Sequence, residues 1–142
     1  MENNNKIIDD RIIDENINSI CSYLKDQKDK YKMFSIDDGV IYKTFNTLNI
    51  RRQIRKFYDE IVKITENYKD PETARGQLAI MLPIVYYDKS RNLLDTEDRF
   101  FKFMKRSIKT LNEIEDGKFK KSLDAYREVF QAIVAYTKEK NR

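Results

Sequence analysis

The sequence predicts an all-α protein, a compact bundle of about five helices that forms a single domain over residues 1–142. Three observations lead to this prediction. The chain of 142 residues has the length of one domain. It contains only 3 glycines and 2 prolines, too few for the many turns of a β-sandwich or barrel. Five stretches place their apolar residues three or four positions apart, as one face of a helix requires.

The first predicted helix covers residues 6–24, where isoleucines and a leucine recur at helical spacing. We expect residues 1–5 to be frayed, as chain ends commonly are. Residues 26–45 follow as a loop or extended link between this helix and the rest, because they begin with a polar stretch and contain the turn signal Asp37-Asp38-Gly39.

The second predicted helix has the clearest pattern in the chain. Thr47 or Asn49 is expected to cap its beginning. The pair Asp70-Pro71 is expected to end it, since the residue before a proline avoids the α conformation. Its apolar stripe is about six turns long and consists of Ile50, Ile54, Phe57, Ile61, Ile64 and Tyr68.

The same Asp70-Pro71 pair begins the third predicted helix, with Asp70 as N-cap and Pro71 at the first helical position. Pro83 lies inside the apolar pattern of this helix, and a proline lacks the N–H that the helix needs there. We therefore expect a kink at Pro83; the alternative is that the helix ends near Met81.

The fourth predicted helix opens at Asp95 or Thr96 and is ended by Gly117. The fifth runs from about Lys118 to Lys140. Both carry a continuous apolar face, which for the fourth helix consists of Phe100, Phe103, Met104, Ser107, Ile108 and Leu111.

The residues needed for several kinds of chemistry are missing. The chain has no histidine and a single cysteine, Cys21, which excludes His-based catalytic triads, Cys/His zinc sites and an intrachain disulfide. It has no glycine-rich phosphate loop and no carboxylates at calcium-loop spacing. We therefore expect no catalytic activity, no metal and no cofactor. The lone cysteine fits a cytoplasmic location, and no run of about 18 apolar residues predicts a membrane span.

The formal net charge of +4 conceals two basic segments. Residues 43–63 contain six basic and two acidic residues, and residues 99–109 contain five basic residues and no acidic one. Residues 1–38, in contrast, are acidic on balance. Such basic segments favour a polyanionic partner, although a solvated helix surface has the same composition.

Two sets of residues within these segments are candidates for contacts with a polyanion such as a nucleic acid. The fourth helix carries a basic stripe on the face opposite its buried one, and no acid lies on the face of the stripe. Its members have the spacing i, i+3, i+4 and i+7 and are Lys102, Lys105, Arg106 and Lys109. The second helix carries Arg51, Arg52, Arg55 and Lys56, and the guanidinium group suits phosphate. The second set predicts a surface that reads a nucleic-acid backbone without sequence specificity, and the stripe favours contact with a polyanion. The alternative is that Arg51 and Arg55 only rim the core.

Three segments resemble the small subunit of the Csm complex, the type III-A CRISPR effector. They are Gln53–Tyr58, Leu82–Tyr87 followed by Arg91, and Phe130–Tyr136. The resemblance covers roughly residues 45–140 and implies that Arg55 and Arg91 contact RNA. Family members often carry a small hydroxyl residue just before the Ile-Arg pair, which in this chain is Ile54-Arg55. This chain has Arg51-Arg52 there instead.

The resemblance implies a small helical bundle whose copies stack along the effector and help to position the guide–target RNA duplex. Its implied partners are guide RNA, target RNA, the backbone subunit, the large polymerase-like subunit and neighbouring copies of itself. Target cleavage and signalling chemistry then belong to those other subunits, and sequence specificity to guide pairing. The basic segments contain no aromatic stacking platform, which agrees with this role. The alternative is a structural helical adaptor that binds acidic proteins and does not touch RNA.

Overall fold

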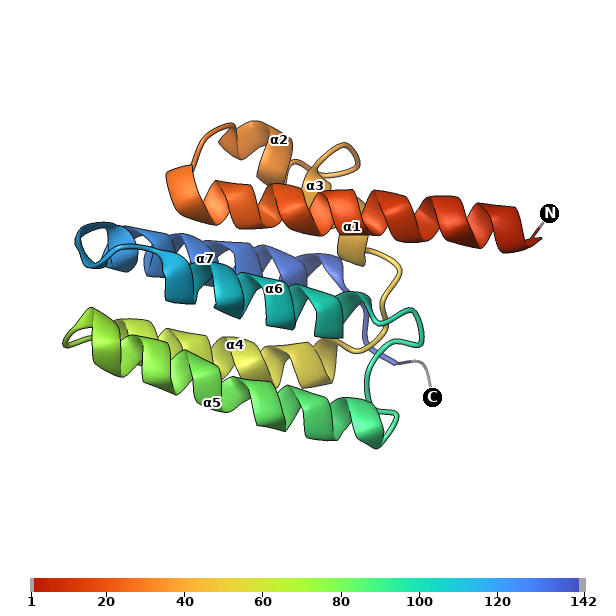
Figure 1. Ribbon diagram of the computed structural model, residues 1–142. Helices are drawn as coiled ribbons and strands as arrows, with labels where there is room; N and C mark the ends of the chain where they lie inside the picture. Colours follow the sequence, from red (N-terminus) through yellow and green to blue (C-terminus); the bar gives the residue numbers. More distant parts are fainter. Residues whose placement is uncertain (1, 141–142) are drawn as a thin grey trace.

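The computed structural model describes the backbone of residues 2–140 and the side chains of residues 10–140. In this part of the chain all regular structure is helical, which confirms the all-α class, but there are seven helices rather than about five (Figure 1). Of the residues expected to be frayed, Met1 lies outside the described residues and residues 2–5 belong to the first helix. The helices are α1 (Glu2–Asp26), α2 (Lys30–Phe34), α3 (Val40–Phe45), α4 (Arg51–Glu66), α5 (Pro71–Ser90), α6 (Arg99–Glu113) and α7 (Asp116–Tyr136).

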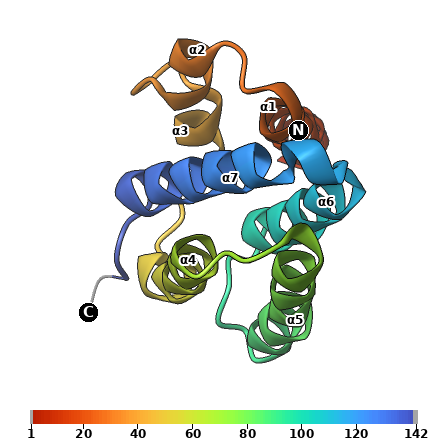
Figure 2. The ribbon, with the colours of Figure 1, turned by 90° about the vertical axis from the view of Figure 1, so that its left-hand side faces the viewer.

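The helices form three layers (Figures 1 and 2). The first layer consists of α1 with α2 and α3, the middle layer of α6 and α7, and the last layer of α4 and α5. Aromatic side chains fill the middle layer: the ring of Phe103 lies 5.6 Å from that of Phe130 on α7 and 5.5 Å from that of Phe45 on α3. All three rings are fully buried, so the core is continuous from the first layer into the second.

The two additional helices, α2 and α3, lie in the segment predicted as a loop or extended link. They are five and six residues long, which is too short for an apolar period to show in the sequence. Met33, Ile41 and Phe45 are buried, so packing against the rest of the protein holds this segment in place. Gly39 joins the two helices at a point where a Cβ atom would overlap the backbone of Ser35.

The predicted beginning of α5 is confirmed. The carboxylate of Asp70 accepts a hydrogen bond from the backbone N–H of Thr73 at 2.7 Å, and Pro71 is the first helical residue. The helix then continues through Pro83 to Ser90, so the alternative of an end near Met81 is wrong. Pro83 is exposed, and so is Ala79, the residue whose carbonyl loses its N–H partner.

Other predicted helix ends are displaced. Neither Thr47 nor Asn49 caps α4, whose N-cap is Ile50. Gly117 lies in the first turn of α7 and does not terminate α6, which ends at Glu113, and α7 ends at Tyr136 rather than near Lys140. The apolar stripes therefore located these helices correctly, while their ends depend on the backbone path between them.

The helix α6 begins at Arg99, later than predicted, but the side chain of Asp95 still accepts hydrogen bonds from its first turn. The Asp95 carboxylate accepts hydrogen bonds from the backbone N–H groups of Arg99 (2.7 Å) and Phe100 (3.1 Å). Burial raises the pKa of Asp95, and these two hydrogen bonds act against that increase. In the described residues no helix is long and apolar enough to cross a membrane.

Candidate nucleic-acid interface

The beginning of α4, the end of α5 and the C-terminal segment lie at the same end of the bundle (Figure 1). Residues from these three parts line a groove there. Its volume is about 580 Å³. Basic side chains predominate among its charged residues, which are Arg51, Arg52, Arg55, Glu139 and Lys140. Asn92, Leu93 and Leu94 line it from the loop that follows α5. The groove thus brings together three of the nine predicted RNA-contacting residues.

The N-terminus of α4 adds to the positive potential of this groove. Ile50 cannot cap the helix with its side chain, and the first turn of α4 contains no acidic residue. The first N–H groups of an α-helix point out of its end and carry a partial positive charge, which attracts anions. Arg52 and Arg55 project from the first two turns, so the helix end and both guanidinium groups act on the same region.

The three arginines of α4 do not have equivalent surroundings. The Arg51 guanidinium donates hydrogen bonds to the carbonyl oxygens of Thr137 and Ala135, and its backbone N–H donates to Lys138. Arg51 therefore caps the C-terminal end of α7 and is engaged with protein groups. Arg52 and Arg55 are exposed and have no acidic partner among the described residues.

Lys56 forms an ion pair that links α4 to α5. Its Nζ atom lies 2.6 Å from a carboxylate oxygen of Asp88, whose side chain is only 6% exposed. Lys56 therefore neutralises a buried acid. Sequence reasoning missed this pairing because the acid lies 32 residues away on another helix.

Arg91, which follows α5, is exposed at the same end of the bundle. Its guanidinium carbon lies 5.5 Å from the centre of the Tyr87 ring, and no acidic residue of the described part pairs with it. The next residue, Asn92, lines the groove. Arg91 thus lies next in the chain to a residue that lines the groove, and the exposed ring of Tyr87 beside it was not expected among the predicted cations.

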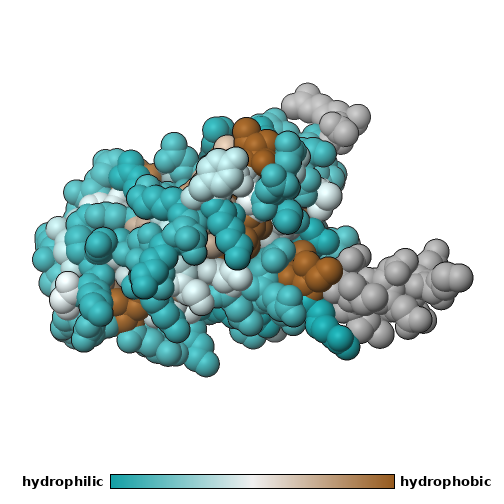
Figure 3. All heavy atoms as spheres, turned by 90° about the horizontal axis from the view of Figure 1, so that it is seen from above, coloured by the Kyte–Doolittle hydropathy of each residue, from teal (hydrophilic) through white to brown (hydrophobic). Residues whose placement is uncertain are grey.

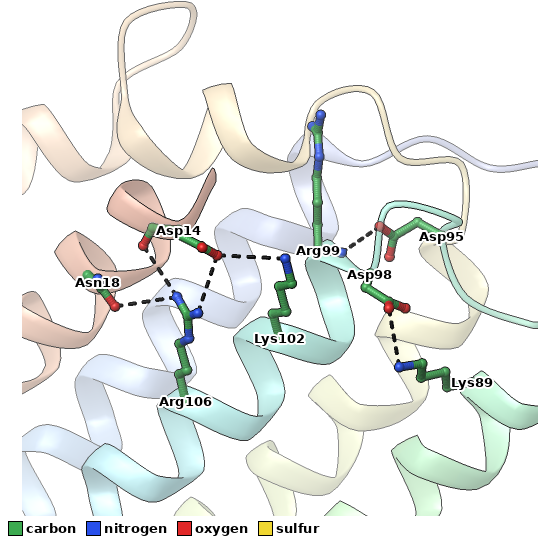
Figure 4. A network of polar contacts seen from close by, with 8 residues as sticks. All are labelled: Asp14, Asn18, Lys89, Asp95, Asp98, Arg99, Lys102 and Arg106. Atoms are coloured by element: carbon green, nitrogen blue, oxygen red, sulfur yellow. Dashed lines mark hydrogen bonds and ion pairs between the residues drawn. The ribbon is translucent and has the colours of Figure 1, made fainter. Parts of the chain in front are cut away.

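The basic stripe of α6 is divided between two environments (Figure 4). Lys102 and Arg106 point towards α1, where the carboxylate of Asp14 lies 3.7 Å from the Lys102 Nζ atom and 3.3 Å from an Arg106 nitrogen. Arg106 also contacts the side chain of Asn18 at 3.5 Å. No acid of α6 forms an ion pair with Lys102 or Arg106 among the described residues, but Asp14 of α1 pairs with both.

The other two members of the stripe, Lys105 and Lys109, are exposed and have no acidic partner among the described residues. The Nζ atom of Lys105 lies 5.6 Å from the centre of the Phe101 ring, over which Lys89 also sits at 4.3 Å. Neither Lys105 nor Lys109 lines the groove, so α6 offers a second, separate pair of cations.

A metal site and a reactive cysteine have little support in the described residues. No group of three or more His, Cys, Asp or Glu side chains there could hold a metal ion. Cys21 is buried, and burial raises the pKa of its thiol, so the thiolate is disfavoured.

A family model described as Csm2 Type III-A matches residues 35–142, which include α3 to α7 and all nine predicted RNA-contacting residues. The matched region leaves out α1 and α2. No curated protein and no solved structure matches the chain.

Proposed function

The chain belongs to the Csm2 family, the small subunit of the type III-A CRISPR Csm complex, and on that premise we propose that it binds the backbone of guide and target RNA within this complex. In this role it catalyses no reaction and reads no sequence. Its other partners are the backbone subunit, the large polymerase-like subunit and neighbouring copies, and its location is the cytoplasm.

The observation that carries the proposal is the group of exposed arginines around the groove. Arg52, Arg55 and Arg91 have no acidic partner among the described residues. Arg52 and Arg55 line the groove beside a helix N-terminus without a side-chain cap, and Arg91 precedes Asn92, which also lines it. Guanidinium groups bind phosphate with two parallel hydrogen bonds. Contacts to phosphate fix position and register without reading bases, as a subunit that relies on guide pairing requires.

The other predicted residues contribute in different ways. Lys105 and Lys109 offer two unpaired cations on α6 for a second contact with the RNA backbone. Arg51, Lys56, Lys102 and Arg106 are engaged with protein groups, so they chiefly hold helices together and add to the local potential. The absence of histidine from the whole sequence supports a role without acid–base catalysis.

The test is the salt dependence of RNA binding by the triple variant Arg52→Ala/Arg55→Ala/Arg91→Ala. The control is Lys118→Ala/Lys120→Ala/Lys121→Ala, which removes three exposed cations at the opposite end of the bundle. Two of them, Lys118 and Lys120, form ion pairs with Glu115 and Asp124. Affinity for single-stranded RNA is measured between about 50 and 200 mM salt, where each lost phosphate contact lowers the log–log slope by about 0.7.

We expect a slope that is lower by about 2 for the groove variant and little change for the control. Equal effects of the two triple variants would contradict the proposed site. Unchanged binding in both, together with normal assembly of the complex, would instead favour the structural adaptor that does not touch RNA.

A further inference from the structure

Aromatic and basic side chains from α5 and α6 meet on a surface where these two helices lie side by side (Figure 2). The ring of Tyr86 on α5 lies 6.1 Å from that of Phe101 on α6, with an angle of 56° between the two planes. The Nζ atoms of Lys89 and Lys105 lie 4.3 Å and 5.6 Å from the centre of the Phe101 ring. These four residues, here called the Tyr86 cluster, do not line the groove.

The two rings of the Tyr86 cluster differ in their surroundings. Phe101 is half-buried, packs against the hydrophobic core and is covered by Lys89. Tyr86, in contrast, is 63% exposed, so much of its ring is open to solvent although Phe101 lies beside it. Phe101 therefore supports the cluster, and Tyr86 presents an aromatic surface that is held in place by a neighbouring ring.

The charge beside Tyr86 is positive. Lys89 is neutralised by an ion pair with Asp98 at 3.2 Å. Lys105 is exposed and has no acidic partner among the described residues, and the same is true of Lys109. Lys109 follows Lys105 by one helical turn, about 6 Å along the axis of α6. Two free cations thus lie in a row on the helix that faces the exposed ring.

We propose that Tyr86 stacks against an unpaired base of RNA while Lys105 and Lys109 bind the phosphates next to that base. An exposed aromatic ring among cations is typical of proteins that bind single-stranded nucleic acid. A base inside a duplex is stacked between its neighbours, so only an unpaired base can present its face to Tyr86. Every base has such a face, and the contact is therefore independent of sequence.

This inference rests on the proposed function, the binding of RNA, and adds to it a contact with a base and a preference for single strands. The ring could not be recognised beside the basic stripe in the sequence, because it belongs to a different helix.

The first measurement uses fluorescence. The chain contains no tryptophan, so a single introduced tryptophan reports on stacking at its own position. The Tyr86→Trp variant is titrated with oligouridylate and, separately, with inorganic polyphosphate, which carries negative charge but no base. We expect saturable quenching by oligouridylate and almost none by polyphosphate, because only a base can stack on the indole ring.

The control for this measurement is the Tyr31→Trp variant. Tyr31 is 83% exposed on α2 and lies between two lysines in the sequence, but it belongs to the first layer of the bundle. Hydrophilic residues predominate on the side of the molecule that shows this layer (Figure 3). We expect no saturable quenching of this variant by either ligand.

The second measurement compares affinities for single-stranded and duplex RNA of the same length. Tyr86→Ala should weaken binding of the single strand at least about fivefold, the lower end of what one stacked base contributes, and should leave duplex binding unchanged. Tyr86→Phe keeps an aromatic ring and should bind normally. The salt slope should not change in either variant, because stacking releases no counterions, whereas Lys105→Ala/Lys109→Ala should lower it by about 1.4. Circular dichroism reports whether each variant is folded.

Three results would overturn the inference. They are a Tyr86→Trp variant that saturating oligouridylate does not quench, equal quenching of the Tyr86→Trp and Tyr31→Trp variants, and a Tyr86→Ala variant that binds single-stranded RNA as tightly as the unsubstituted chain. If Tyr86→Ala binds normally while the groove variant loses its salt slope, the stacking contact is refuted and the proposed function stands. The reverse result supports the stacking contact and contradicts the groove, and a chain that binds no RNA contradicts both.

Discussion

Replacing Lys56 by methionine should destabilise the protein far more than an ordinary surface change. Lys56→Met keeps the apolar stem but removes the ammonium group 2.6 Å from the Asp88 carboxylate. Removing one partner of a fully buried ion pair costs about 3–5 kcal/mol, because the other charge stays buried without compensation. Lys56 is 50% exposed, so solvent reaches one side of the pair and reduces this cost. We therefore expect the free energy of unfolding to fall by about 2–3 kcal/mol.

The assay is urea denaturation, with the midpoint and the slope measured for each variant. Lys63→Met is the matched control, since its partner Glu60 is exposed and the loss should stay within about 0.5 kcal/mol. Lys56→Met/Asp88→Leu should recover most of the stability, because no buried charge remains. A loss for Lys56→Met no larger than that of the control would refute the reasoning.

Two further predictions concern the first layer and the helix cap. Asp14→Asn should leave Lys102 and Arg106 of α6 unpaired, so the salt dependence of RNA binding should become steeper while the free energy of unfolding changes by less than about 1 kcal/mol. An unchanged slope would show that these two cations do not meet RNA. Hydrogen bonds from the first turn of α5 lower the pKa of Asp70 in the folded protein. The stabilisation by the Asp70 carboxylate is therefore complete above the pKa of the unfolded chain, about 3.9, and is lost as the pH falls through the lower pKa of the folded protein. Asp70→Ala should therefore flatten the fall in stability measured in acid, and an acid limb that superimposes on that of the unsubstituted chain would contradict the role of this cap.

The parts of the fold that could be predicted are those determined by local pattern. The stripe from Ile54 to Ile64 makes α4 recognisable, and Asp70-Pro71 marks the start of α5 through capping chemistry within four residues. The short helices α2 and α3 contain too few turns to show a period. They form because Met33 and Phe45 find buried positions, which only the assembled core provides.

The same distinction applies to the candidate site. The exposure of Arg52 and Arg55 follows from their positions relative to the apolar stripe of their own helix. The pairing of Lys56 with Asp88, and of Arg106 with Asp14, depends on how two helices pack, and no spacing within one helix reveals it. Sequence patterns therefore identified the cations but could not separate those free to meet a ligand from those already neutralised.

The position of α1 affects where this domain can be cut. The family match begins at residue 35, yet Ile17, Ile20 and Leu24 of α1 are fully buried, and α1 packs on α3, α6 and α7. A truncated chain that starts at Ser35 would leave one side of the middle layer uncovered and would expose apolar surface to solvent. The minimal folding unit of this protein is thus larger than the segment that defines its family.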